Sequence, residues 1–346
     1  MSFEEIMQEI TSGFTGDTEK DLAYLKEQAE KYKDHEMSKE ILRACGRLMY
    51  EHLPDDKKAE IGQYMNNDVE SWYSILEEAR FNHFQNNKEK ALTLIESLVK
   101  RVEEMTDAGM FANDAVSEYY CFNDPMETTL YFVNSGVQKT LRAPDRFPFA
   151  TVYLYYGSLL IDFDRIDDAQ AALKKAVRWN PANADISFEY AETYKMKGEF
   201  EEYFKLSLNI FKYAYTPHTL ARCYRNIGFY FIEKKLWQEA MACYILSLQF
   251  ERDSKNAQSE LYYINQMTEG KVKEPGIDFI KAAAEKYGFP VGADNNVLGV
   301  AFSLGKEFAE QNNFAGAKHF FGIVYELTDD EEIKNMIDAL PDPEDE

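Results

Sequence analysis

One spacing between small residues constrains the fold of this chain more than any other feature. Three times, a glycine is followed twelve positions later by an alanine: Gly157 and Ala169, Gly228 and Ala240, and Gly305 and Ala317. Small residues are needed where two helices cross closely, because larger side chains would push the backbones apart. Around these pairs, apolar residues recur at helical intervals between short turns rich in Asn, Asp, Gly and Pro. The spacing therefore predicts an all-α chain built from repeated helical hairpins.

The repeat resembles that of the tetratricopeptide repeat family, whose unit of about 34 residues folds into two antiparallel helices. The unit 150–183 matches the family pattern in full, through Tyr153, Tyr156, Gly157, Leu160, Ala169, Leu173, Ala176 and Pro181. Three further units, 184–217, 221–254 and 298–331, match in part, and the first of these has Tyr203 where a small residue is expected. The resemblance implies an all-α fold, a right-handed superhelix (α-solenoid) of stacked antiparallel helical hairpins.

The remainder of the chain is assigned to helical hairpins from its apolar periodicity alone. The expected division has six segments: 1–66, an N-terminal helical hairpin region; 67–145, degenerate hairpins; 150–254, three repeat units; 255–297, a degenerate hairpin and connector; 298–340, a C-terminal unit with a capping helix; and 341–346, an acidic tail. Residues 17–53 are expected to form a hairpin that Asp17 or Thr18 caps. The stretches 112–143 and 255–288 have the length of a hairpin without the small-residue spacing.

The charge of the chain argues against nucleic acid as a partner. Its 38 basic and 61 acidic residues give a formal net charge of −23, so most of the surface would repel a polyanion. Residues 201–250 are the exception, because basic residues outnumber acidic ones there. We therefore expect the partner to be a protein or peptide segment.

Nothing in the sequence indicates a membrane or an oxidising compartment. Residues 1–5 lack the basic start of a secretory signal, and the uncharged run 147–161 is too short to span a bilayer. In the repeat register this run is a buried first helix. The cysteines form no Cys-x-x-Cys motif, so neither a disulfide framework nor a zinc site is expected at Cys45, Cys121, Cys223 and Cys243. These features predict a cytoplasmic protein without a metal or cofactor.

No constellation of reactive side chains predicts catalysis. The five histidines have neither a metal-ligand spacing nor a neighbouring nucleophile motif. The acidic cluster at 162–168 lacks the glycine and the bidentate acid of a calcium loop, and its place in the repeat predicts helix capping. An enzyme with a dispersed site is kept as an alternative, centred on Tyr119, Tyr120, Cys121 and Asp124.

A concave groove is the site that the resemblance implies. In the family it is lined by fixed positions of each first helix, which here hold Thr151, Leu154, Ser158, Asp185, Phe188, Glu192, Lys195, Arg222, Arg225, Phe229, Ile232, Phe302 and Lys306. An apolar stripe would lie beside two arginines in this groove, made by Leu154, Phe188 and Phe229. Such a surface would suit an extended or helical peptide that carries an acidic group.

A structural interpretation of the same arginines competes with binding. Arg222 and Arg225 are expected to face acidic side chains on the preceding helix: Asp185, Glu189 and Glu192. Such pairs would only balance charge along the stack, and this is the interpretation that we favour. Exposed pairs add about 0 to 1 kcal/mol each, so a binding role stays open.

The expected function is that of a non-enzymatic scaffold or adaptor that binds a protein or peptide segment in the concave groove. One version of the family clamps a C-terminal carboxylate with Lys, Arg and Asn, but the matching positions here hold Leu154, Ser158, Glu189, Arg222 and Asn226. Most of that clamp is absent, so an adaptor for chaperone tails is not expected. The alternative function is a peptide-sensing regulatory protein that acts through another protein.

Overall fold

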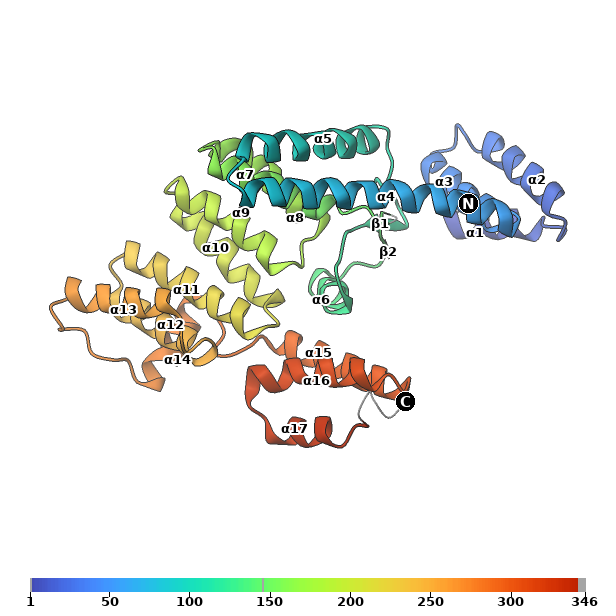
Figure 1. Cartoon of the computed structure of the whole chain (residues 1–346). Helices are drawn as coiled ribbons and strands as arrows, with labels where there is room; N and C mark the ends of the chain where they lie inside the picture. Colours follow the sequence, from blue (N-terminus) through green and yellow to red (C-terminus); the bar gives the residue numbers. More distant parts are fainter. Residues whose placement is uncertain (1, 145, 342–346) are drawn as a thin grey trace. The chain divides into compact units, whose positions relative to one another are not determined.

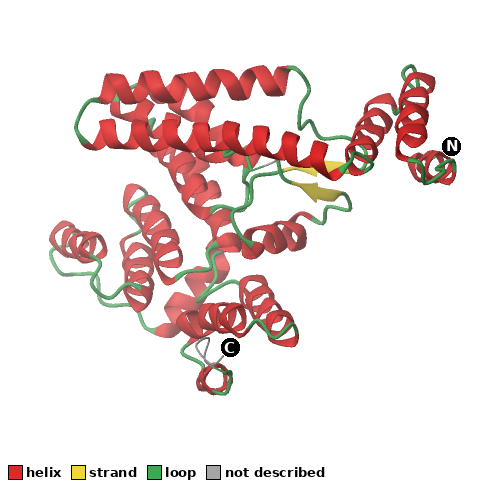
Figure 2. Cartoon of the chain, turned by 45° about the vertical axis from the view of Figure 1, so that its right-hand side comes forward, coloured by secondary structure: helices red, strands yellow, loops and turns green. Residues whose placement is uncertain are grey.

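The structure is a computed structural model that describes residues 2–144 and 146–341, without the side chains of residue 60 and residues 62–67. It divides into two compact units, unit 1 (Met1–Cys121 and Gln138–Val152) and unit 2 (Phe122–Val137 and Tyr153–Glu346). Helices form nearly all of the regular structure in each unit (Figures 1 and 2). Apart from residue 341, the expected acidic tail lies outside the described residues.

In its described residues, unit 1 contains five complete helices and two short strands. Their bounds are α1 Phe3–Ser12, α2 Thr18–Lys31, α3 Ser38–Glu51, α4 Asp55–Phe84, α5 Lys88–Asp107, β1 Ser117–Tyr119 and β2 Thr140–Arg142. Helices α1 to α3 share a small core of Ile6, Ile10, Leu25, Ile41 and Cys45. Helices α4 and α5 form a hairpin that buries the aligned pair Ala79 and Ala91. The unit is thus built from helical hairpins whose apolar faces meet.

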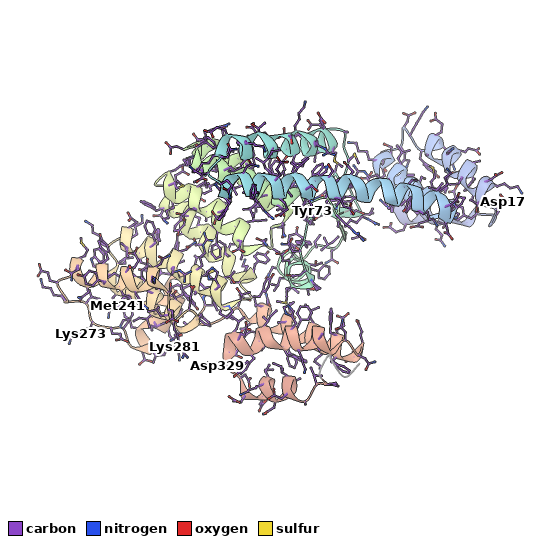
Figure 3. All side chains as sticks on the ribbon, in the orientation of Figure 1. Asp17, Tyr73, Met241, Lys273, Lys281 and Asp329 are labelled. Carbon is purple, nitrogen blue, oxygen red and sulfur yellow. The ribbon has the colours of Figure 1, made fainter. Side chains whose placement is uncertain are left out.

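Capping residues set the starts of the first two helices. Ser2 caps α1 in a capping box with Glu5, whose side chain accepts a hydrogen bond from the Ser2 amide. Asp17, labelled in Figure 3, accepts a hydrogen bond from the Lys20 amide at 3.2 Å and caps α2. Of the two caps expected for this helix, Asp17 is therefore the one used.

The stretch 112–143 is not the helical hairpin that its length suggested. It contains β1 and β2, which pair in parallel with Ser117 opposite Thr140, and one helix between them. Asp114 is the physical reason, because its carboxylate accepts hydrogen bonds from the Val116 and Ser117 amides and holds a turn before β1. Arg43 fixes the same turn through the carbonyls of Gly109 and Ala112. Side-chain bonds to the backbone thus replace helical ones here.

Unit 2 contains the repeat units and helix α6, which precedes them in the sequence. Its helices are α6 Pro125–Ser135, α7 Phe149–Asp162, α8 Ile166–Trp179, α9 Ala184–Met196, α10 Phe200–Ile210, the 3-10 helix η1 Phe211–Tyr213, α11 Pro217–Glu233, α12 Trp237–Phe250, α13 Lys255–Met267, α14 Ile277–Tyr287, α15 Asn295–Glu310, α16 Phe314–Thr328 and α17 Glu331–Asp338. The division between the two units falls within α7. In the described part of the chain, no helix is both long and apolar enough to cross a membrane.

The three glycines of the repeat spacing lie at close helix contacts. A Cβ atom built on Gly157 would lie 2.5 Å from Leu173, and one on Gly305 would lie 2.6 Å from Phe321. The contact at Gly228 is looser, with Tyr244 at 3.0 Å. Each glycine therefore meets the bulky residue four positions beyond the paired alanine, one helical turn further along. A large side chain from the second helix fills the space that the glycine leaves.

Most repeat helices of unit 2 pack against the next helix along the chain. Contacts join α8 to α9, α9 to α10, α10 to α11, α11 to α12 and α12 to α13, and they also join α15 to α16 and α16 to α17. Tyr203, at the position where the repeat favours a small residue, is buried and its ring meets Phe229. The expected all-α solenoid of stacked antiparallel hairpins is thereby confirmed as the architecture of this unit.

Candidate functional site

The first helices of successive units, α9, α11 and α13, carry the strongest cluster of polar and aromatic side chains. We call this surface the α9–α13 face and define it by Glu189, Glu192, Lys195, Arg222, Arg225, Phe229 and Glu260. Side-chain contacts of Arg222 and Lys195 join α9 to α11, and α13 packs on α12, the second helix of the preceding hairpin. All of these residues belong to unit 2.

Arg222 pairs with the preceding helix, as the structural interpretation expects. Its Nη2 donates a hydrogen bond to Glu189 Oε1 at 2.9 Å, and its guanidinium lies 4.5 Å from the centre of the Phe188 ring. Phe188 is 0% exposed beneath it and belongs to the core. The expected apolar stripe is therefore wrong at Phe188, because the neighbouring arginine covers the ring.

Arg225 forms a different pair from the one expected. It donates hydrogen bonds to the Glu251 carboxylate at the end of α12 and to Ser247 Oγ at 3.3 Å, so it does not pair with the acidic residues of α9. Its side chain is 13% exposed. Burial would raise the pKa of Glu251, but the hydrogen bond and charge of Arg225 lower it below its ordinary value. This arginine joins the two helices of its own unit.

Lys195 and Phe229 bring α9 and α11 together at the centre of the face. Lys195 Nζ lies 2.6 Å from Glu192 Oε1 and 4.7 Å from the centre of the Phe229 ring. The ring also meets Phe200 and Tyr203 edge to face. Phe229 remains half-buried, so part of its ring is accessible beside an ion pair.

Glu260 on α13 is the functional candidate that sequence reasoning missed. Burial raises the pKa of its carboxyl, and the charge of Lys195 offsets only part of that rise. Within the described part of the chain, Glu260 accepts no hydrogen bond and forms no ion pair. The signal that could have found it is the repeat register, which makes α13 the first helix of the degenerate unit after residue 254.

The outer residues of the expected groove have contacts within their own hairpins. On α7, Ser158 Oγ donates a hydrogen bond to the Leu154 carbonyl at 3.0 Å. On α15, Lys306 Nζ lies 5.8 Å from the centre of the Phe302 ring, which in turn meets Phe321 of α16. Asp185 is exposed near the start of α9. Their membership of one continuous groove stays a prediction.

Two residues of the enzyme alternative make contacts that support the local structure. Tyr120 donates a hydrogen bond to Glu118, and Asp124 caps α6. Among residues 2–144 and 146–341, no three His, Cys, Asp or Glu side chains lie together as metal ligands would. Burial raises the pKa of the Cys223 and Cys243 thiols, which makes both poor nucleophiles.

Comparison with known proteins points to one repeat family. The family model described as tetratricopeptide repeat matches residues 160–202, across the end of one unit and the start of the next. No curated protein matches the chain.

Three solved structures resemble the fold at low sequence identity. PilF of Pseudomonas aeruginosa has 12% identity and a TM-score of 0.41, over 78% of this chain and 97% of that one. YrrB, a tetratricopeptide repeat protein with an unusual peptide-binding site, has 13% identity and a TM-score of 0.30, over 62% and 98%. The Cut9–Hcn1 assembly of the APC/C has 11% identity and a TM-score of 0.34, over 93% and 60%. TM-scores this low support no inference about the ligand of this chain.

Proposed function

We propose that this chain, whose residues 160–202 match the tetratricopeptide repeat, is a non-enzymatic scaffold that binds a segment of another protein on the α9–α13 face. Stacked helical repeats form extended surfaces that commonly serve for binding. The observation that carries the proposal is Glu260, a half-buried carboxylate that forms no hydrogen bond or ion pair in the described chain and feels the charge of Lys195, which itself lies over the half-buried ring of Phe229. Burying a charge without a partner is unfavourable, so such a group is a candidate for contact with a ligand.

The charges on this face favour a basic segment over an acidic one. Arg222 and Arg225, which an acidic ligand would need, already pair with Glu189 and Glu251. Glu260 has no such partner and would gain one from a lysine, an arginine or an amino terminus. The net charge of −23 would also attract a basic segment at long range.

The apolar contact would come from Phe229. A partner side chain that packs on the exposed part of this ring would lie beside Lys195, whose charge also acts on Glu260. The proposed ligand is therefore a short segment with an aliphatic or aromatic residue next to a basic one. Aromatic anchors of this kind supply much of the affinity in protein interfaces.

A selection from a random peptide library displayed on phage tests the proposal. The full chain is immobilised, and the recovered peptides are then retested on the Glu260→Gln and Phe229→Ala variants. We expect recovered peptides that combine a basic and an apolar residue and that bind both variants more weakly. Enrichment of acidic peptides, or equal binding to both variants, would refute the assignment of this face. Solution scattering of the complexes addresses the peptide-sensing alternative, which requires a change in overall dimensions.

A further inference from the structure

Helix α6 lies in unit 2 although the strands on either side of it belong to unit 1. It contacts η1 and α15, and Figure 1 shows it beside α15. Two apolar side chains anchor it, because Met126 and Leu130 are buried in the core of unit 2. At 11 residues, α6 is shorter than the ~12 to 15 residues that an isolated helix needs in water. Its helical structure therefore depends on this docking.

A buried carboxylate fixes the start of α6. Glu127 is 1% exposed, and its Oε2 and Oε1 accept hydrogen bonds from Asn180 Nδ2 at 2.7 Å and Asn183 Nδ2 at 2.6 Å. The amide and side chain of Asn123 donate two more, at 2.7 and 3.1 Å. Four N–H donors thus surround one carboxylate, which is how proteins recognise an acid by geometry.

Two further contacts place α6 along the turns that precede the first helices of three units. Tyr215 donates from Oη to Asp124 Oδ2 at 2.7 Å, immediately before α11 begins. Asn296, near the start of α15, donates to Asn134 Oδ1 at 3.1 Å. Asn183, which binds Glu127, is the N-cap of α9. We call this set, Asn180, Asn183, Tyr215 and Asn296, the turn edge of unit 2.

We infer that the turn edge is a second binding site, specific for a helix that begins Asn-Asp-Pro-Met-Glu and continues to a leucine three residues later, and that α6 is its intramolecular ligand. A partner helix with the same determinants would replace α6. The inference does not depend on the proposed function, because the turn edge shares no residue with the α9–α13 face. Recognition of a short helix through one acid and two apolar anchors is an established mode of peptide binding.

Competition with α6 sets the conditions under which a partner binds. A tethered ligand such as α6 acts at an effective concentration in the millimolar range. A free helix must therefore compete with α6 for the turn edge. Weakening α6 without altering the turn edge raises the fraction of open sites, and the apparent affinity for a free helix rises in proportion.

Fluorescence anisotropy with a labelled peptide of residues 122–137 tests the inference on the full chain. We expect the Glu127→Ala chain to bind this peptide about tenfold or more tightly than the unaltered chain does. Adding Asn180→Ala and Asn183→Ala should remove the gain, as should the same Glu127→Ala change in the peptide. The Glu285→Gln chain, altered at an exposed glutamate of α14, should behave as the unaltered one. Equal affinity of the Glu127→Ala and unaltered chains would overturn the inference.

Hydrogen exchange of the unaltered chain gives a second test if the Glu127→Ala chain does not fold. With the peptide added at millimolar concentration, we expect faster exchange of the α6 amides and unchanged exchange in α11. Exchange of α6 that does not respond to the peptide would show that α6 is a fixed part of the core.

Discussion

The guanidinium of Arg222 lies 4.5 Å from the centre of the Phe188 ring and covers it from solvent. The two residues stand on the first helices of neighbouring units, so their contact closes the junction between α9 and α11. Arg222 also pairs with Glu189 of the same helix as Phe188. Arg222, which was expected to line the groove, thus contributes to the stacking of two units.

Alanine substitutions at this junction compare the contribution of the buried Phe188 ring to stability with that of Arg222, which lies over it. We expect Phe188→Ala to lower the free energy of unfolding by about 3 to 5 kcal/mol, because it leaves a cavity. Arg222→Ala should lower it by only about 1 to 2 kcal/mol, through the lost ring contact and a partly exposed ion pair. Urea denaturation followed by circular dichroism measures both values. A larger loss at Arg222 than at Phe188 would contradict the arrangement.

The glycine contacts predict a second pair of opposite effects. We expect Gly305→Ala to destabilise the chain by about 1 to 3 kcal/mol, because the new methyl group would overlap the Phe321 ring. Gly299→Ala, on the same helix but with no atom within 4 Å of its added Cβ, should stabilise it by up to about 1 kcal/mol. Thermal unfolding of the two variants compares them directly. Equal effects would show that the crossing is looser than described.

Glu260 predicts a particular dependence of stability on pH. Burial raises the pKa of this carboxyl in the folded state, so the folded chain keeps its proton to a higher pH than the unfolded chain does. Its contribution to stability therefore falls as pH rises from the ordinary pKa of about 4.5 through the raised one. Glu260→Gln should match the unaltered chain at acidic pH and become the more stable of the two towards neutrality. Melting temperatures across that pH range check the sign, and a variant less stable at neutral pH would reverse it.

Arg43 predicts the behaviour of the turn before β1. Its guanidinium donates to the carbonyls of Ala112 and Gly109 at 2.6 and 2.9 Å and pairs with the buried Asp114. We expect Arg43→Ala to destabilise the chain by about 3 kcal/mol, because it leaves that carboxylate without its cation. Arg43→Lys should recover only part of the loss, since lysine lacks the planar fork. Hydrogen exchange of residues 109–120 should accelerate in both variants, and unchanged exchange would argue against this role.

Local pattern was enough to predict the repeat units, whereas distant contacts decide the segment that the pattern missed. The spacing of Gly157, Gly228 and Gly305 reflects crossings inside single hairpins, so each is visible within one unit of sequence. The turn before β1 depends on Arg43, which lies far from Asp114 in the sequence. A contact between residues so far apart leaves no periodic pattern in the sequence. The expectation of a helical hairpin at 112–143 is therefore wrong.

At the candidate site, too, the sequence predicts which helices meet but not which side chains pair. The repeat register predicts that Arg222 faces acidic residues of the preceding first helix, and the pair of Arg222 with Glu189 agrees with it. It could not reveal that Arg222 covers Phe188, or that Arg225 turns to Glu251 at the end of its own hairpin. These outcomes depend on side-chain directions. The sequence did not point to Glu260 as a site residue, because α13 lacks the small-residue spacing that identifies the repeat units.

The most direct measurement of the proposed function is the affinity of one selected peptide for three forms of the chain: unaltered, Glu260→Gln and Glu285→Gln. Both substitutions remove one negative charge, but Glu285 is exposed on α14, outside the α9–α13 face. A contact between a basic group and Glu260 is worth about 1.5 to 3 kcal/mol, so Glu260→Gln should raise the dissociation constant about tenfold or more. Glu285→Gln should leave it nearly unchanged. Equal weakening by the two variants, or none by Glu260→Gln, would contradict the proposal that this face holds the partner.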